Sequence, residues 1–262
     1  MRGGVHPIGA TMGNRGRPKD VIIWLASYPR SGNTLLRIIL KRCFGLDSYS
    51  IYGDDEFADP TVQQIVGEKP VGPDPKAFLQ HMLQEKRLVC VKTHQLPTPD
   101  SHSAIYVVRD GRAAVVSHYH YLRDFWDTQI TLDDLIKGID NRSWSQHVNA
   151  WLFSGRSNVL TLRYEDIIRG DKAAQVAIAA FIGRPSPSEF DVRFSELHDM
   201  MPAFFRAGSN ESNIAEMTPE QLALFERLHG GTLHALGYPA ANARAGRTPD
   251  PQSLSPANSR SA

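Results

Sequence analysis

The sequence predicts an α/β fold in three layers (α/β/α), with helices on both sides of a central, mostly parallel sheet. Two observations point to it. Short apolar runs rich in β-branched residues are continuous rather than alternating, as in strands buried on both faces of a sheet. The segments between these runs are long enough for the helices that connect parallel strands.

Four runs are predicted to be strands, and helical periodicity follows three of them. The expected strands are Val21 to Ala26, Leu88 to Val91, Ala104 to Val108 and Val159 to Leu162. The helices expected after the first, third and fourth strands are Asn33 to Lys41, Gly111 to Tyr121 and Lys172 to Ile182. A last helix is expected over Thr218 to Leu236, with Thr218 as its N-cap, Pro219 in its first turn and Gly237 after its end.

Length and composition favour one globular domain. The chain has 262 residues, of which 41% are hydrophobic and 22% charged, and it shows no internal repeat or long linker. Residues 1–19 and 240–262 are poor in apolar side chains, so we expect two flexible tails around a domain at residues 20–239.

Charge and cysteine content exclude several classes of protein. With 29 basic and 28 acidic residues, the net charge of +1 predicts no nucleic-acid partner. No apolar run approaches the length of a membrane span, and no signal peptide is recognisable, so we expect no membrane partner. Cys43 and Cys90 are too few for a disulfide framework or a four-cysteine zinc site, which favours the reducing cytoplasm. The sequence does not define the oligomeric state.

A polar cluster follows each predicted strand. In chain order the clusters are Ser27-Tyr28-Pro29-Arg30-Ser31-Gly32-Asn33-Thr34, Lys92-Thr93-His94, Arg109-Asp110-Gly111-Arg112 and Arg163-Tyr164-Glu165-Asp166. In open α/β sheets the ligand crevice lies outside the carboxyl ends of the strands, so we expect the clusters to converge on one site.

The first cluster lies between a strand and a helix, where backbone N–H groups and the helix dipole attract anions. This position makes it a phosphate loop and the fold P-loop-type. It is not a strict Walker A motif, because the leading glycine is absent and Arg30 precedes Ser31-Gly32 where a lysine would follow the second glycine. The alternative is an ordinary turn that needs Gly32 only for its backbone conformation.

The clusters resemble the motifs of the sulfotransferases that use 3′-phosphoadenosine 5′-phosphosulfate (PAPS). The first is similar to the family's 5′-phosphosulfate loop, and Tyr106-Val107-Val108-Arg109-Asp110-Gly111-Arg112 with Ser117 to its 3′-phosphate site. Val91-Lys92-Thr93-His94-Gln95-Leu96-Pro97 resembles its Lys-Thr-His segment, and Tyr164-Glu165-Asp166 its Tyr-Glu-Asp signature. The four matches occur in the family's order between Ser27 and Asp166.

A fifth, weaker match is Arg206-Ala207-Gly208, followed by Thr218-Pro219-Glu220, which resembles the family's C-terminal Arg-Lys-Gly loop and the next helix. It implies that Arg206 and the Gly208 amide grip the 3′-phosphate. The chain departs from the family pattern at several positions. Arg30 replaces the loop lysine, Leu35 a tryptophan that stacks on adenine, and Ala207 the lysine of the C-terminal loop. Glu211-Ser212-Asn213 replaces a Gly-Asp-Trp segment, and Ile214 and Ala223 replace the charged ends of the family's dimer motif.

The resemblance implies a role for each cluster. His94 is the expected catalytic base, with Lys92 and Arg30 neutralising charge on the departing phosphate. Ser31, Gly32, Asn33 and Thr34 would cradle the 5′-phosphate, with Leu35 beside them. Arg109 and Ser117, two helical turns apart, would hold the 3′-phosphate, and Tyr164 would contact adenine. These cations suffice without a metal, and no metal-ligand spacing is present.

The resulting prediction is a sulfotransferase that moves a sulfuryl group from PAPS to a hydroxyl of a small-molecule or carbohydrate acceptor, leaving 3′,5′-adenosine bisphosphate (PAP). One alternative is a small-molecule or nucleotide kinase, against which the missing lysine after Gly32 and the pair Arg109 and Ser117 argue. Another is a catalytically idle nucleotide-binding relative, against which Lys92 and His94 argue. No signature in the chain specifies the acceptor.

Overall fold

The computed structural model describes residues 22–53, 59–85, 88–126, 128–140, 142–190, 196, 198, 199 and 210–240. In this part of the chain, five strands form one sheet of order β2-β3-β1-β4-β5, and all neighbouring pairs are parallel. The predicted tails, apart from Ala240, lie outside the described residues, and the domain limits remain a prediction.

The four predicted strands are confirmed to within a few residues. The strands are β1 (Ile22–Ala26), β2 (Ser48–Ser50), β3 (Val89–Thr93), β4 (Ser103–Val108) and β5 (Val159–Arg163). The unpredicted strand β2 is a three-residue edge strand with two serines, so it has no apolar run to mark it.

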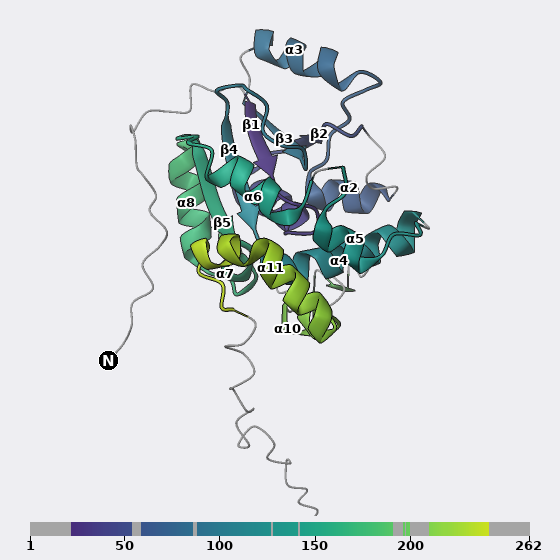
Figure 1. Cartoon of the computed structure of the whole chain (residues 1–262). Helices are drawn as coiled ribbons and strands as arrows, with labels where there is room; N and C mark the ends of the chain where they lie inside the picture. Colours follow the sequence, from purple (N-terminus) through teal and green to yellow (C-terminus); the bar gives the residue numbers. More distant parts are fainter. Residues whose placement is uncertain are drawn as a thin grey trace, which may run out of the picture.

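Helices cover both faces of the sheet, which confirms the three layers (Figure 1). They are α1 (Asn33–Phe44), α2 (Pro60–Val66), α3 (Pro75–Glu85), α4 (Gly111–Trp126), α5 (Leu132–Lys137), α6 (Trp144–Leu152), α7 (Tyr164–Ile168), α8 (Lys172–Ile182), α10 (Asn210–Ile214) and α11 (Pro219–Ala235). The four predicted helices are among them, and Thr218 caps α11 in a capping box with Gln221. No helix in the described segments is long and apolar enough to cross a membrane.

Side chains of the central strands alternate between two apolar cores. Ile23 and Leu25 of β1 pack with residues of α1 and α8. Trp24 and Ala26 pack on the other face with residues of α4, α6 and α11. Burial on both faces accounts for the continuous apolar runs of these strands.

The strand register brings the polar clusters together. Ala26 at the end of β1 pairs with Thr93 of β3 on one side and with Tyr106 of β4 on the other. Ser50 of β2 pairs with Lys92. The segments that leave these strands therefore emerge side by side at one edge of the sheet.

Candidate active site

The loop between β1 and α1 is a tight turn that depends on Gly32. Gly32 has φ 107°, and a Cβ at this position would lie 2.7 Å from Cδ2 of Tyr164. The side chain of Asn33 ties the start of α1 to the end of β1, because its Nδ2 donates to the Leu25 carbonyl oxygen at 2.8 Å. No side chain caps α1, so its first N–H groups are open to a ligand.

Ser31 provides a direct test of whether this loop fits an anion. Its hydroxyl oxygen is buried and has no hydrogen-bond partner among the described residues. A buried hydroxyl without a partner is costly, and a bound phosphate oxygen would satisfy it. The hydroxyl, the uncapped helix and the partly exposed Thr34 in the first turn fit a phosphate group.

Leu35 is an exception among the predicted site residues. Its side chain is 1% exposed and belongs to the core between the sheet and α1. The structure therefore does not bring this side chain to the site, because α1 turns this position toward the sheet.

Arg30, Arg109 and Ser117 lie together at the ends of β1 and β4. Arg109 Nη1 donates to the Arg30 carbonyl oxygen at 3.1 Å, and Arg30 Nε donates to Ser117 Oγ at 3.4 Å. Arg30 has φ 63°, a left-handed conformation that turns the loop toward α4. The structure thus links the two arginines and the serine, while their roles toward a ligand stay a prediction.

Arg109 does not pair with its neighbour Asp110. The Asp110 carboxylate is instead held by Arg112 in a buried two-point ion pair, with N–O distances of 2.9 and 2.7 Å. Tyr164 packs its ring 4.5 Å from the Arg109 guanidinium carbon and is 7% exposed. Burial raises the pKa of Tyr164, so its hydroxyl remains protonated.

His94 follows β3 and is fixed by the loop after β1. Its Nδ1 lies 2.8 Å from the Ser27 carbonyl oxygen, which can only accept, so Nδ1 carries the proton and Nε2 keeps a free lone pair. Burial, and then the charge of Lys92, hold the pKa of His94 well below its ordinary value of 6.5. The ring is therefore neutral at pH 7, as a base must be before it accepts a proton.

Lys92 and His94 share a neighbour, Tyr52, that sequence reasoning missed. The Tyr52 oxygen accepts from the His94 backbone N–H at 2.8 Å, and the two rings stack with 23° between their planes. Lys92 is 6% exposed, and its Nζ lies 5.4 Å from the centre of the Tyr52 ring. Tyr52 itself is 51% exposed, so the lysine and the histidine lie just beneath the surface of the site.

Helix α6 supports the loop that carries His94. His147 Nε2 donates to the His94 carbonyl oxygen at 3.1 Å, and Trp151 Nε1 donates to the Gln95 carbonyl oxygen at 3.0 Å. The Tyr106 hydroxyl donates to His147 Nδ1 at 2.8 Å and so fixes its tautomer. Burial lowers the pKa of His147 to about 4, which keeps it neutral. His147 carried no signal in the sequence, because its role depends on packing between distant segments.

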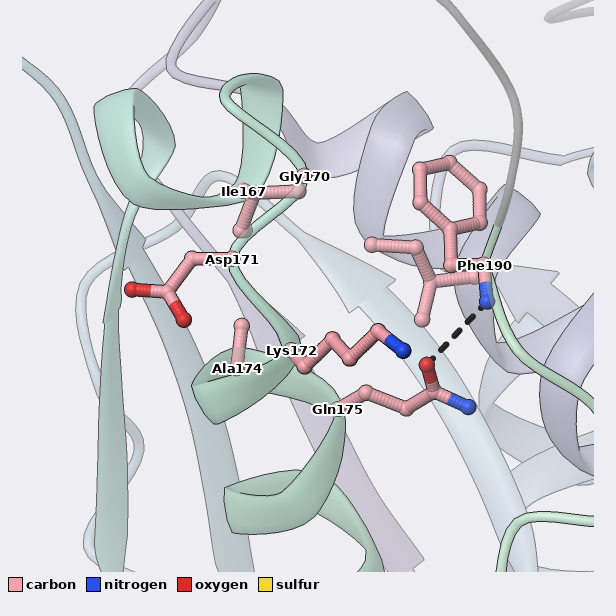
Figure 2. Close-up of a pocket in the computed structure, with 8 residues that line it drawn as sticks. Ile167, Gly170, Asp171, Lys172, Ala174, Gln175 and Phe190 are labelled. Carbon is pink, nitrogen blue, oxygen red and sulfur yellow. Dashed lines mark hydrogen bonds between the residues drawn. The ribbon is translucent and has the colours of Figure 1, made fainter.

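One group of predicted site residues is not tested by the structure, and one hollow lies away from the site. Arg206, Ala207 and Gly208 lie outside the described residues. A small hollow beside α7 and α8 contains none of the predicted site residues (Figure 2). Phe190 is one of its lining residues, and its backbone N–H donates to Gln175 Oε1 at 3.1 Å.

An open parallel sheet with a glycine turn after its first strand and basic side chains at its carboxyl edge is typical of α/β proteins that bind phosphorylated ligands. The chain matches the family model of the sulfotransferase domain over residues 20–237, and it belongs to this PAPS-dependent sulfotransferase family.

Curated relatives agree with this assignment. Human sulfotransferase 2B1 is 27% identical over 183 residues, covering 65% of this chain and 48% of the relative. Dog sulfotransferase 1A1 is 27% identical over 192 residues, covering 66% of this chain and 62% of the relative. The matched part of the chain thus spans only about half to three fifths of the length of these relatives.

Solved structures share the fold. Mouse sulfotransferase SULT7A1 complexed with PAP has a TM-score of 0.58 and 22% identity, covering 82% of this chain and 84% of that one. Retinol dehydratase in complex with androsterone and the inactive cofactor PAP has a TM-score of 0.56 and 21% identity, covering 86% of this chain and 84% of that one.

Proposed function

We propose that this protein transfers a sulfuryl group from PAPS to a hydroxyl of a small-molecule or carbohydrate acceptor, with His94 as the general base. The observation that carries the proposal is the His94 ring itself. Its Nδ1 proton is held by the Ser27 carbonyl, which leaves Nε2 as the basic atom. Lys92 lies two residues before His94, near the end of β3, where it pairs in register with Leu25 of β1.

PAPS, when bound, supplies an activated sulfuryl group. The side chains of this chain then have separate tasks. His94 Nε2 takes the proton of the acceptor hydroxyl, and the cations of Lys92 and Arg30 stabilise the negative charge that grows on the nucleotide phosphate. Ser31, Asn33 and Thr34 hold the 5′-phosphate through the start of α1, while Arg109 and Ser117 bind the 3′-phosphate.

The acceptor class is an alcohol or phenol in the broad sense. Retinol and androsterone occupy solved structures of retinol dehydratase, and both are small molecules with a hydroxyl, the group proposed as the acceptor here. The exposed face of the Tyr52 ring beside His94 offers a flat apolar surface for such an acceptor. We propose the cytoplasm as the compartment, because the chain has only two cysteines, Cys43 and Cys90, and both are buried.

Calorimetry tests the nucleotide half of the proposal. The protein should bind PAP at micromolar concentrations, and Arg109→Ala or Ser117→Ala should abolish this binding. Preference for ATP with Mg²⁺ over PAP would favour the kinase alternative and refute the proposal. Turnover of labelled PAPS with a panel of phenols, sugars and alcohols tests the other half, and an absence of turnover with PAP binding intact would identify an idle relative.

A further inference from the structure

The Arg109 guanidinium donates a hydrogen bond to the side-chain amide of Asn210, a residue that the sequence did not indicate. Asn210, the first residue of α10, is 8% exposed, and its Oδ1 accepts from Arg109 Nε at 2.8 Å. Its Nδ2 donates to Glu165 Oε1 at 2.6 Å. Arginine can only donate and a carboxylate can only accept, so the two ends of the amide are assigned without ambiguity.

Glu165 is itself anchored, which makes the amide a fixed support. Its Oε1 also accepts from the Asp110 backbone N–H at 3.0 Å, and its Oε2 accepts from the Tyr238 hydroxyl at 3.0 Å. The chain of contacts runs from the start of α4 and the end of α11 through Glu165 and Asn210 to Arg109. A side chain with an acceptor at one end and a donor at the other is required between an arginine and a glutamate, and asparagine provides both.

The same contacts decide which edge of the guanidinium is left for a ligand. Asn210 engages Nε, the Arg30 carbonyl engages Nη1, and the Tyr164 ring covers one face. Within the described part of the chain, Nη2 has no hydrogen-bond partner. Asn210 lies between Arg109 and the Glu165 carboxylate, so an amide orients the guanidinium in place of a direct ion pair with Glu165.

We propose that Asn210 is a positioning residue that presents the free edge of Arg109 to a 3′-phosphate and so makes the site selective for a 3′-phosphorylated nucleotide. This inference rests on the proposed function. It concerns binding, and its readout is therefore affinity rather than turnover.

Calorimetry should compare PAP with adenosine 5′-phosphate, which lacks the 3′-phosphate, in wild type and in Asn210→Ala. We expect Asn210→Ala to weaken PAP binding about tenfold or more and to leave adenosine 5′-phosphate binding within about twofold of wild type, because hydrogen bonds to charged groups contribute at this scale. Glu211→Gln, an exposed change one residue away, is the matched control and should leave both affinities at wild-type values.

A second measurement separates positioning from damage to the fold. In an Arg109→Lys background, the lysine lacks the fork that Asn210 holds, so adding Asn210→Ala should cause no further loss of PAP affinity. Equal losses for both nucleotides, an unchanged preference for PAP in Asn210→Ala, or full additivity in the double variant would each overturn the inference while leaving the proposed function standing. Failure of wild type to bind PAP would overturn both.

Discussion

The imidazole Nδ1 of His94 lies 2.8 Å from the carbonyl oxygen of Ser27. This contact joins the end of β3 to the loop after β1, and it selects the tautomer whose basic atom, Nε2, is free. A single backbone carbonyl thus both orients the ring and prepares it to accept a proton.

Replacing His94 tests this role directly. His94→Ala should reduce sulfuryl transfer at least about a hundredfold, since general-base catalysis contributes at this scale, while PAP affinity stays near the wild-type value. Steady-state turnover and calorimetry on the same preparation provide the two measurements. Turnover close to wild type would remove His94 from the role of base.

The pH dependence of kcat/KM should reflect the lowered pKa of His94. Because burial and Lys92 hold this pKa well below 6.5, the base stays unprotonated through that pH, and the rate should fall only under more acidic conditions. In Lys92→Met the repulsive charge is gone, so the acid limb of the residual rate should move upward toward 6.5. A limb centred at 6.5 in wild type would contradict this assignment.

The central strands of the fold were predictable because burial on both faces of the sheet produces continuous apolar runs. Trp24, Val91 and Tyr106 lie in strands that are covered on both faces, and their segments stand out in the sequence. The short strand β2 and the five-residue helices α7 and α10 carry no periodic pattern of sufficient length. Their existence depends on tertiary packing.

The site was predictable only where polar residues directly follow a strand. Arg30, Lys92, His94 and Arg109 belong to such clusters, and the parallel register brings three of the clusters together. Tyr52, His147 and Asn210 were missed because each meets its partner across a long sequence separation, 101 residues for Asn210 and Arg109. Leu35 was predicted to lie at the ligand because of its position in a motif. The periodicity of α1 instead turns the Leu35 side chain into the core.

His147 should support catalysis without touching the substrate. His147→Leu removes the donor to the His94 carbonyl and should lower kcat about tenfold with little change in PAP affinity. His147→Gln retains an N–H donor at a similar position and should restore most of the rate. Asn149→Ala removes a different hydrogen bond of the same helix, the one accepted from Thr232 Oγ1 at 3.1 Å, and serves as the control that leaves the His94 loop untouched. Equal rates for the leucine and glutamine variants would show that the hydrogen bond has no role in positioning.

His147 should also make stability depend on pH. The unfolded side chain binds a proton near its ordinary pKa of 6.5, whereas burial lowers the folded value to about 4. The unfolded state therefore binds more protons between these values, and stability falls as the pH drops through this window. His147 accounts for a decrease of about 2 kcal/mol in the free energy of unfolding between about pH 7 and about pH 5. Urea unfolding at both pH values should show a smaller loss for His147→Gln, and an unchanged loss would contradict the assignment.

Substitution of Gly32 by alanine should destabilise the protein more than the same substitution at Gly45, which also has a left-handed backbone conformation. Gly32→Ala places a methyl group 2.7 Å from the Tyr164 ring, which is itself packed against Arg109, so the loop or the ring must move. Gly45 has φ 63° and no atom within 4 Å of the place that a Cβ would occupy, so Gly45→Ala costs only the left-handed backbone conformation, about 1 kcal/mol. We expect Gly32→Ala to lower the free energy of unfolding by at least about 1 kcal/mol more than Gly45→Ala and to abolish PAP binding. Denaturant unfolding and calorimetry on both variants check this, and equal behaviour would mean that the close approach of Gly32 to Tyr164 does not shape the loop.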